Sequence, residues 1–432
     1  MNGSCTRREA PVARKYKSSD IFKPGTFPEH TYIFRQALGN TSYETLLEEA
    51  LETPGFLTSI VGPSKSGKSV LCDKVIGPDR IVSLSGGDLK AKEDFWVTIG
   101  KKLGLPFEME TTTTQGHEIQ GSAKGGGELN FFVKKLNVDA SLQMKGQKSH
   151  ADREKRLTHK DLVLEEMVSR DLVLVLDDFH YIATDYQMEI AQQLKDSIRK
   201  ELKAVVISLP HRSDDAIREN PDLNGRMSFI NIDPWNQNDL SEIANKGFPL
   251  LGVSIPQNFA QRLAKESITS PQLMQSICLN LARVLQVDQN MSIQTVTDEH
   301  NIEDALRRTT LSMAYRDVIK ALVAGPPTRG KQRKSYQLED GSQADLYGTL
   351  FKAIAKDPPI VSLTFDEIKR RVASVLSQQE ARPDRRRLSE ALKHIQAIIQ
   401  TSGQLYQVLE WKDQEIYILD PYFLFYLRWG AY

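Results

Sequence analysis

The segment 62–69 constrains the fold of this chain more than any other, because it has the form GxxxxGK[ST]. The apolar run 56–61 precedes the segment and the helical pattern 70–76 follows it, which predicts a strand, a loop and a helix in that order. In such an arrangement, backbone N–H groups and the helix N-terminus converge on a phosphate group. We expect Lys68 to reach the β and γ phosphates of a nucleotide and Ser69 to ligate Mg²⁺. The predicted nucleotide-binding residues are Gly62, Pro63, Ser64, Lys65, Ser66, Gly67, Lys68, Ser69 and Val70.

A second run, residues 171–178, ends in two carboxylates. Its side chains are too continuously apolar for a strand with one face in water, so the run predicts a central strand of a parallel sheet covered by helices on both sides. Ligands of open α/β sheets bind outside the carboxyl ends of the strands, and Asp177 and Asp178 are therefore expected beside the loop. We assign Asp177 to Mg²⁺, held through water, and Asp178 to orienting or activating the attacking water.

Composition excludes several classes of protein. Lys and Arg number 56 and Asp and Glu number 56, so no global field attracts this chain to nucleic acid or membrane. Cys5, Cys72 and Cys278 are far apart without metal-ligand spacing, which favours a reducing cytoplasm. No apolar run approaches the roughly 18 residues of a membrane span, and the N-terminus lacks a signal-peptide pattern. We expect a cytoplasmic protein without a membrane partner.

At 432 residues the chain is long enough for about three domains. Helical patterns alternate with short apolar strands as far as about residue 232, which predicts an α/β fold with a doubly wound parallel sheet. Order is expected to begin near Tyr32, and a helix over 187–202 to bury Met188, Ala191 and Leu194. The expected divisions are a polar basic arm (1–30), an ATPase core (31–235) with an insertion of turns and hairpin strands (104–160), a helical lid (236–290), a helical linker with a basic loop (291–340) and a C-terminal winged-helix domain (341–432).

The C-terminal pattern is helix (365–376), helix (384–401) and hairpin, the order of a winged helix. Two interpretations stay open. Basic residues of the second helix, among them Arg385, Arg386 and Arg387, could contact DNA phosphates together with the basic loop 329–334. Alternatively, these charges form a solvated face, and the domain packs on the ATPase core as a regulatory brake.

These features together resemble the AAA+/STAND class of P-loop ATPases over residues 40–290, in the branch of origin-recognition initiators, transposition regulators and bacterial defence ATPases. The resemblance places Ser208 at the sensor 1 position, in contact with nucleotide. It implies that Arg226 projects into the nucleotide site of a neighbouring subunit. Two departures favour slow hydrolysis: segment 267–273 contains Pro271 but no sensor 2 arginine, and Asp178 stands where fast motors carry Glu.

The hypothesis from sequence is an ATP- and Mg²⁺-dependent switch that hydrolyses ATP slowly, forms a homo-oligomer and regulates a separate effector protein, in prokaryotic antiviral defence. One alternative is an initiator-type or transposition-type ATPase that binds DNA directly. Another is a scaffold that holds nucleotide without turnover. Lys68, Asp177, Asp178 and Arg226 are the expected catalytic residues.

Overall fold

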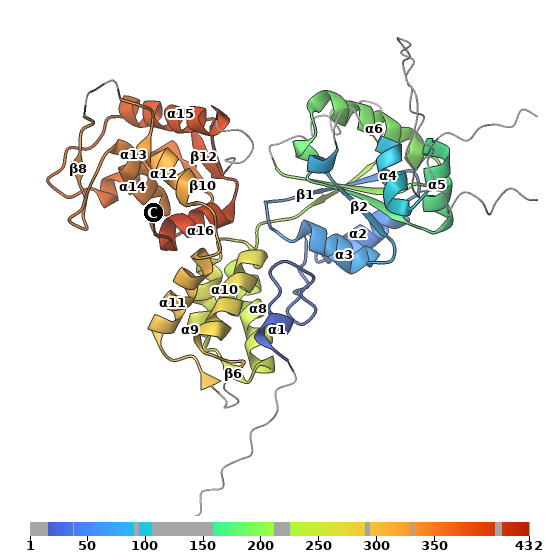
Figure 1. Ribbon diagram of the computed structural model, residues 1–432, viewed down its shortest axis with the longest axis horizontal. Helices are drawn as coiled ribbons and strands as arrows, with labels where there is room; N and C mark the ends of the chain where they lie inside the picture. The colour runs from blue at the N-terminus through green and yellow to red at the C-terminus, as the bar shows by residue number, and fades with distance from the viewer. Residues whose placement is uncertain are drawn as a thin grey trace, which may run out of the picture.

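The central element is a five-stranded parallel sheet with the order β2-β3-β4-β1-β5 (Figure 1). The computed structural model describes residues 16–37, 39–89, 95–105, 159–210, 225–289, 294–328, 330, 332–401 and 408–431. Most of the expected insertion 104–160 therefore lies outside the described residues. The strands are β1 (Leu57–Val61), β2 (Ile81–Ser85), β3 (Val173–Asp177), β4 (Lys203–Ser208) and β5 (Met227–Asn231). The predicted doubly wound α/β sheet is confirmed.

Helices cover both faces of the sheet, as the continuous apolar run in β3 requires. Val173 and Val175 pack into the core on the face covered by α2 and α3, whereas Leu174 and Leu176 pack on the other face, against α4, α5 and α6. Side chains of a strand alternate between faces, so only a strand buried on both sides is apolar at every position. The helices are α2 (Tyr43–Glu52), α3 (Lys68–Ile76), α4 (Phe95–Leu103), α5 (His159–Ser169) and α6 (Thr184–Ile198).

The prediction for the helix over 187–202 is wrong in two details. The helix α6 begins at Thr184 and ends at Ile198, and the side chain of Met188 is exposed rather than buried. The buried stripe contains Tyr186, Ile190 and Leu194. At 100° per residue, position 188 lies almost opposite position 186 on the helix, so it faces solvent.

The N-terminal segment was expected to be a polar arm over 1–30 that packs on the body or on a partner, and the part that the structure describes packs on the lid. The chain is described from Tyr16, and a short helix, α1 (Ser18–Ile21), packs against the lid. Ile21 and Phe22 are fully buried, and the ring of Phe22 lies 4.9 Å from that of Phe248. A Cβ added to Gly247 would lie 2.4 Å from the Phe22 ring, so this glycine makes room for it. Order thus begins well before Tyr32.

The lid is helical, as predicted, and follows directly after β5. It extends beyond the expected bounds 236–290 to include α11 (Glu299–Thr310), and it contains a parallel pair of two-residue strands, β6 (Val253–Ser254) and β7 (Gln294–Thr295). The lid helices are α8 (Gln237–Leu250), α9 (Gln257–Glu266), α10 (Pro271–Val284) and α11 (Glu299–Thr310).

The C-terminal elements contain the expected helix, helix and hairpin, with a third strand that the sequence pattern did not reveal. This strand, β10 (Ser362–Thr364), pairs with the hairpin to give an antiparallel sheet ordered β10-β12-β11. The hairpin turns at Asp413 and Gln414, which both have positive φ, as a type I′ turn requires. The remaining elements are α12 (Arg316–Ala324), β8 (Tyr336–Gln337), β9 (Gln343–Ala344), α13 (Leu346–Ala355), α14 (Phe365–Val375), α15 (Arg385–Thr401), β11 (Leu409–Lys412), β12 (Glu415–Ile418) and α16 (Pro421–Trp429).

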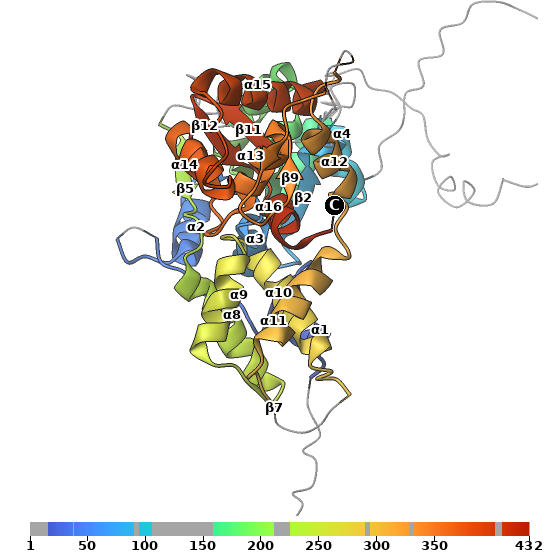
Figure 2. The same ribbon diagram turned by 90° about the vertical axis from the view of Figure 1, so that its left-hand side faces the viewer.

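The lid and the C-terminal elements share one hydrophobic core, which runs without interruption from α8 to α16. Figures 1 and 2 show α16 next to the lid helices, beneath the rest of the C-terminal elements. The last helix of the chain therefore joins the two parts. Among the residues that the structure describes, no helix combines the length and hydrophobicity needed to cross a membrane.

Candidate functional site

The predicted phosphate loop connects β1 to α3, and its backbone conformation explains two of its residue types. Gly67 has φ 92° at the N-cap of α3, a conformation that favours glycine. Gly62 lies against Ile232, whose Cβ would be 2.9 Å from a Cβ added at this glycine. The loop therefore passes close to the segment that follows β5 and then turns sharply into α3. This turn leaves the first N–H groups of α3 facing the loop.

Lys68 is buried inside the loop. Its ammonium group donates hydrogen bonds to the carbonyl oxygens of Gly62 at 2.8 Å and Pro63 at 2.7 Å. Burial lowers the pKa of Lys68 to about 8, and the nearby carboxylates of Asp177 and Asp178 oppose this shift. The loop thus holds a cation that its surroundings stabilise poorly, which suits a site built to receive an anion.

The carboxyl end of β3 brings the predicted acidic residues to the loop. The hydroxyl of Ser69 donates a hydrogen bond to Asp177 Oδ2 at 2.5 Å, and the backbone N–H of Asp178 donates to Asp177 Oδ1 at 2.8 Å. A serine hydroxyl beside a carboxylate is the hard-oxygen donor pair that Mg²⁺ prefers. Ser69 and Asp177 therefore fit the metal role predicted for them, with water and phosphate oxygens completing the shell.

Asp178 follows in the left-handed conformation, with φ 54°. Its backbone carbonyl would lie 2.2 Å from a Cβ at Gly86, so the glycine after β2 allows the two segments to touch. Burial, and then the charge of Asp177, raise the pKa of the Asp178 carboxyl above its ordinary value. A carboxylate that is costly to keep charged is a reasonable proton acceptor, as expected for a residue that orients or activates water.

A cavity of about 490 Å³ opens beside the loop. This volume lies within the range of small-molecule sites. Its walls include the loop, the carboxyl end of β3 with Asp177 and Asp178, the N-terminal segment 23–35, and the start of α10 in the lid. Pro271, Gln272 and Gln275 are the α10 residues, and Arg35 is the only arginine among the described residues of the lining. The described lid residues in this lining thus include two glutamines and no arginine.

Residues outside the motif fasten the loop to its surroundings, and sequence reasoning missed their roles. Trp235 donates from its indole nitrogen to the carbonyl of Ser66 at 2.8 Å, and Arg35 lies over the Trp235 ring at 4.6 Å. Ser270, at the N-cap of α10, donates to the carbonyl of Lys65 at 3.4 Å. Trp235 was interpreted only as a core or domain-contact residue, because a single tryptophan gives no signal of a backbone partner so distant in sequence.

Ser208 and Arg226, the two residues assigned by resemblance, lie at opposite ends of the sheet. Ser208 is buried at the carboxyl end of β4, where its carbonyl accepts from the N–H of Gly62 at 3.4 Å. Arg226 precedes β5, and its carbonyl accepts from the N–H of Leu57 at 2.9 Å, at the start of β1. Arg226 therefore does not line the cavity of its own subunit.

The sheet order, the loop after β1 and the acidic end of β3 define an α/β fold of the P-loop NTPase type. No protein-family model matches the chain, and no curated protein does. The chain is similar in structure to Cdc6p from Pyrobaculum aerophilum, with 16% identity, a TM-score of 0.43 and coverage of 95% of this chain and 97% of that chain.

Two other solved structures are similar at a comparable level. One is a Walker-type ATPase of Pyrococcus abyssi, with 13% identity, a TM-score of 0.45 and coverage of 89% of this chain and 94% of that chain. The other is the RuvB Holliday junction branch migration motor of Thermotoga maritima, with 13% identity, a TM-score of 0.37 and coverage of 89% and 94%. At these identities and TM-scores, the similarities do not define the function of this chain.

Proposed function

We propose that the protein binds ATP with Mg²⁺, hydrolyses it slowly and acts as a switch. The observation that carries this proposal is the contact of 2.5 Å between Ser69 and Asp177, directly beside a loop that buries Lys68. These side chains come from segments 108 residues apart, and they meet in the arrangement that phosphate and magnesium require. The adjoining cavity supports the proposal because it is large enough for a ligand.

In this proposal Lys68 exchanges its two carbonyl contacts for oxygens of the β and γ phosphates. Mg²⁺ would be held by Ser69 and, through water, by Asp177, and it would neutralise charge on the phosphates. Asp178 orients the attacking water and accepts its proton. Its aspartate side chain is one methylene shorter than the glutamate of fast motors, which supports slow rather than processive turnover.

Calorimetry of ATP binding tests the assignment. Lys68→Ala removes the cation of the loop and is expected to weaken ATP binding by about a hundredfold or more. Lys74→Ala is the matched control, because Lys74 is an exposed cation on the same helix, α3, outside the cavity lining. Equal affinities for the two variants would refute the site.

Assembly is the second part of the proposal. Arg226 lies next to β5, at the edge of the sheet, so a neighbouring subunit could dock there and receive its guanidinium at a bound nucleotide. Arg226→Ala should bind ATP as a monomer but lose ATP-dependent assembly, which sedimentation measures. Partial rescue by a Lys68→Ala subunit, which supplies an intact Arg226, is expected. If Arg226→Ala assembles with ATP as the parent does, Arg226 does not act on the nucleotide of a neighbouring subunit. The next candidate for that role, Arg212, lies outside the described residues.

The output of the switch is assigned to a separate effector protein, in the cytoplasm and in antiviral defence, on the strength of the sequence resemblance to bacterial defence ATPases. Cys72 and Cys278 are buried free thiols, which supports a reducing compartment. Purification of the protein from its native cell with ATP and with ADP tests the effector hypothesis. A partner that is retained in one nucleotide state and released in the other is the expected result. Identical co-purifying proteins in both states would contradict it.

DNA binding is a second candidate, favoured by one observation. The C-terminal order of helices and hairpin is that of a winged helix, and α15 exposes Arg385, Arg386, Arg387 and Lys393. Two of these charges are already paired within the helix region, Arg386 with Glu390 and Arg387 with Asp384. Duplex binding that weakens steeply with salt, and that is lost in Arg385→Ala/Lys393→Ala, would support this function. Binding unchanged by the double substitution would exclude α15 as the DNA contact.

A further inference from the structure

The last helix of the chain touches the phosphate loop directly. The ammonium group of Lys65, in the middle of the loop, lies 5.2 Å from the centre of the Tyr422 ring on α16. The Tyr422 hydroxyl lies 3.3 Å from the hydroxyl of Ser276 on α10, which fixes the ring between the lid and the loop. Burial raises the pKa of Tyr422 to about 12, so the ring presents a neutral phenol to the lysine.

The Lys65 side chain has two possible partners, the Tyr422 ring and a phosphate group in the cavity. It is exposed, it lines the cavity, and it adopts the left-handed conformation with φ 58°. Its positive charge also offsets part of the rise in the pKa of Asp178, which lines the same cavity. Lys65 thus contacts the Tyr422 ring and also lines the cavity that phosphates would occupy.

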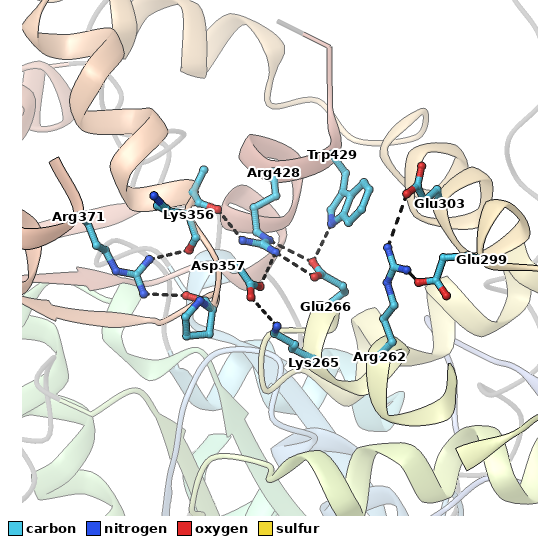
Figure 3. A network of polar contacts seen from close by, with 12 residues as sticks. Arg262, Lys265, Glu266, Glu299, Glu303, Lys356, Asp357, Arg371, Arg428 and Trp429 are labelled. Carbon is cyan, nitrogen blue, oxygen red and sulfur yellow. Dashed lines mark hydrogen bonds and ion pairs between the residues drawn. The ribbon is translucent and has the colours of Figure 1, made fainter. Parts of the chain in front are cut away.

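The other end of α16 is fixed to the lid and to the C-terminal elements (Figure 3). The guanidinium of Arg428 donates to both carboxylate oxygens of Glu266, at 3.1 and 2.9 Å, and Trp429 donates to the same carboxylate at 2.7 Å. Arg428 also contacts Asp357 at 3.1 Å, and Asp357 accepts from Lys265 at 2.6 Å. Because α16 is one continuous helix, a force at Tyr422 is transmitted to this network.

We propose that Lys65 is shared between nucleotide phosphate and Tyr422, so that ATP releases α16 from the loop and α16 in turn lowers the affinity for ATP. The inference rests on the proposed ATP binding and adds its regulation. An exposed lysine gains less from an aromatic ring than from a charged phosphate oxygen, so phosphate wins the competition. Linkage makes the effect reciprocal: whatever holds Lys65 on Tyr422 must be broken before Lys65 binds phosphate.

The direction of this effect distinguishes it from a structural role. Tyr422→Leu keeps an apolar side chain but removes the ring face, so it frees Lys65 and should tighten ATP binding by about two- to fivefold. Tyr422→Phe is the matched control, because it keeps the ring and loses only the hydroxyl near Ser276; its affinity should equal that of the parent. In a Lys65→Met background, Tyr422→Leu should no longer change ATP affinity.

Hydrogen exchange of α16 gives a second readout that does not depend on substitution of the partly buried Tyr422. ATP should accelerate exchange in α16 of the parent. Lys65→Met, a substitution at an exposed position of the loop, should show exchange in α16 that is faster than in the parent even without ATP. Addition of ATP should cause no further change in this variant.

The outcomes distinguish a failure of the proposed function from a failure of the further inference. Parent protein that does not bind ATP refutes the proposed function itself. Parent protein that binds ATP, with Tyr422→Leu equal to or weaker than the parent, or with α16 exchange unaffected by ATP and by Lys65→Met, refutes the sharing of Lys65 alone.

Discussion

Removal of the Arg428 guanidinium should unfasten the C-terminal elements from the lid. The Arg428 and Glu266 side chains are 9% and 6% exposed. In Arg428→Met the Glu266 carboxylate would stay buried and keep the hydrogen bond from the Trp429 indole, but it would lose its counter-ion. Arg428 also donates to the carbonyl of Ala355, which would lose that partner.

The magnitude follows from the cost of a buried charge without its counter-ion. Breaking a buried pair by removing one partner costs about 3–5 kcal/mol, which corresponds to local opening that is about a hundredfold or more easier. Replacing both charges, in Arg428→Met/Glu266→Met, should recover much of the loss because no charge is then left buried. Arg386→Met is the matched control: its pair with Glu390 is exposed on α15, and exposed pairs contribute little.

Native-state hydrogen exchange of α13 and α16 measures the local free energy of opening without assuming that a chain of 432 residues unfolds in two states. We expect fast exchange in Arg428→Met, partial recovery in the double variant, and parental exchange in Arg386→Met. If Arg428→Met exchanges within about threefold of Arg386→Met, the buried pair does not hold α16 and the reasoning is wrong.

Three further predictions concern the candidate nucleotide site. Burial lowers the pKa of Lys68 to about 8 in the free protein, and bound phosphate favours the charged form of this lysine. ATP affinity, measured by calorimetry, should therefore fall about tenfold from about pH 7 to about pH 9. Constant affinity over this interval would contradict the burial of a charged Lys68. Asp178→Asn should keep MgATP binding but slow hydrolysis by about a hundredfold or more, measured in single turnovers with labelled ATP; turnover at the parental rate would assign water activation to another group. Gly86→Ala should lower the free energy of unfolding by about 1–3 kcal/mol and slow hydrolysis, because its Cβ would lie 2.2 Å from the Asp178 carbonyl oxygen. Gly87→Ala is the control, since its Cβ would meet nothing closer than 3.7 Å. If both variants unfold at the same temperature, the close approach at Gly86 is not required.

Patterns local in sequence predicted the sheet and the centre of the site. The loop 62–69 and the end of β3 at Asp177 each lie within a short stretch whose residue types have one physical explanation. Both carboxylates reach the loop because parallel strands end at one edge of the sheet, a rule that needs no knowledge of side-chain packing. The prediction for Met188 was wrong because this residue lies beyond the edge of the buried stripe, about 60° from Ala191, although Ala191 and Leu194 are buried as predicted.

The contacts that join separate parts of the chain could not be predicted in this way. Glu266 and Arg428 are 162 residues apart, and each alone is an ordinary charged residue in a helix. Tyr422 gave no sign of its contact with Lys65, because cation and ring lie in different elements whose relative placement depends on the shared core from α8 to α16. The burial of Ile21 and Phe22 was missed for a related reason: two apolar residues in a polar segment show no periodicity.

The packing of α1 on the lid also has a consequence for synthesis of the protein. Ser18 donates from its backbone and its hydroxyl to Asp288, which lies 270 residues later in the chain. At about 5–20 residues per second, a ribosome needs about 15–50 s to make the partner after Ser18 has been added. During that interval Ile21 and Phe22 have no lid to enter and stay exposed to water. This segment can therefore complete its packing on the lid only after Asp288 has been made, although it is synthesised 270 residues earlier.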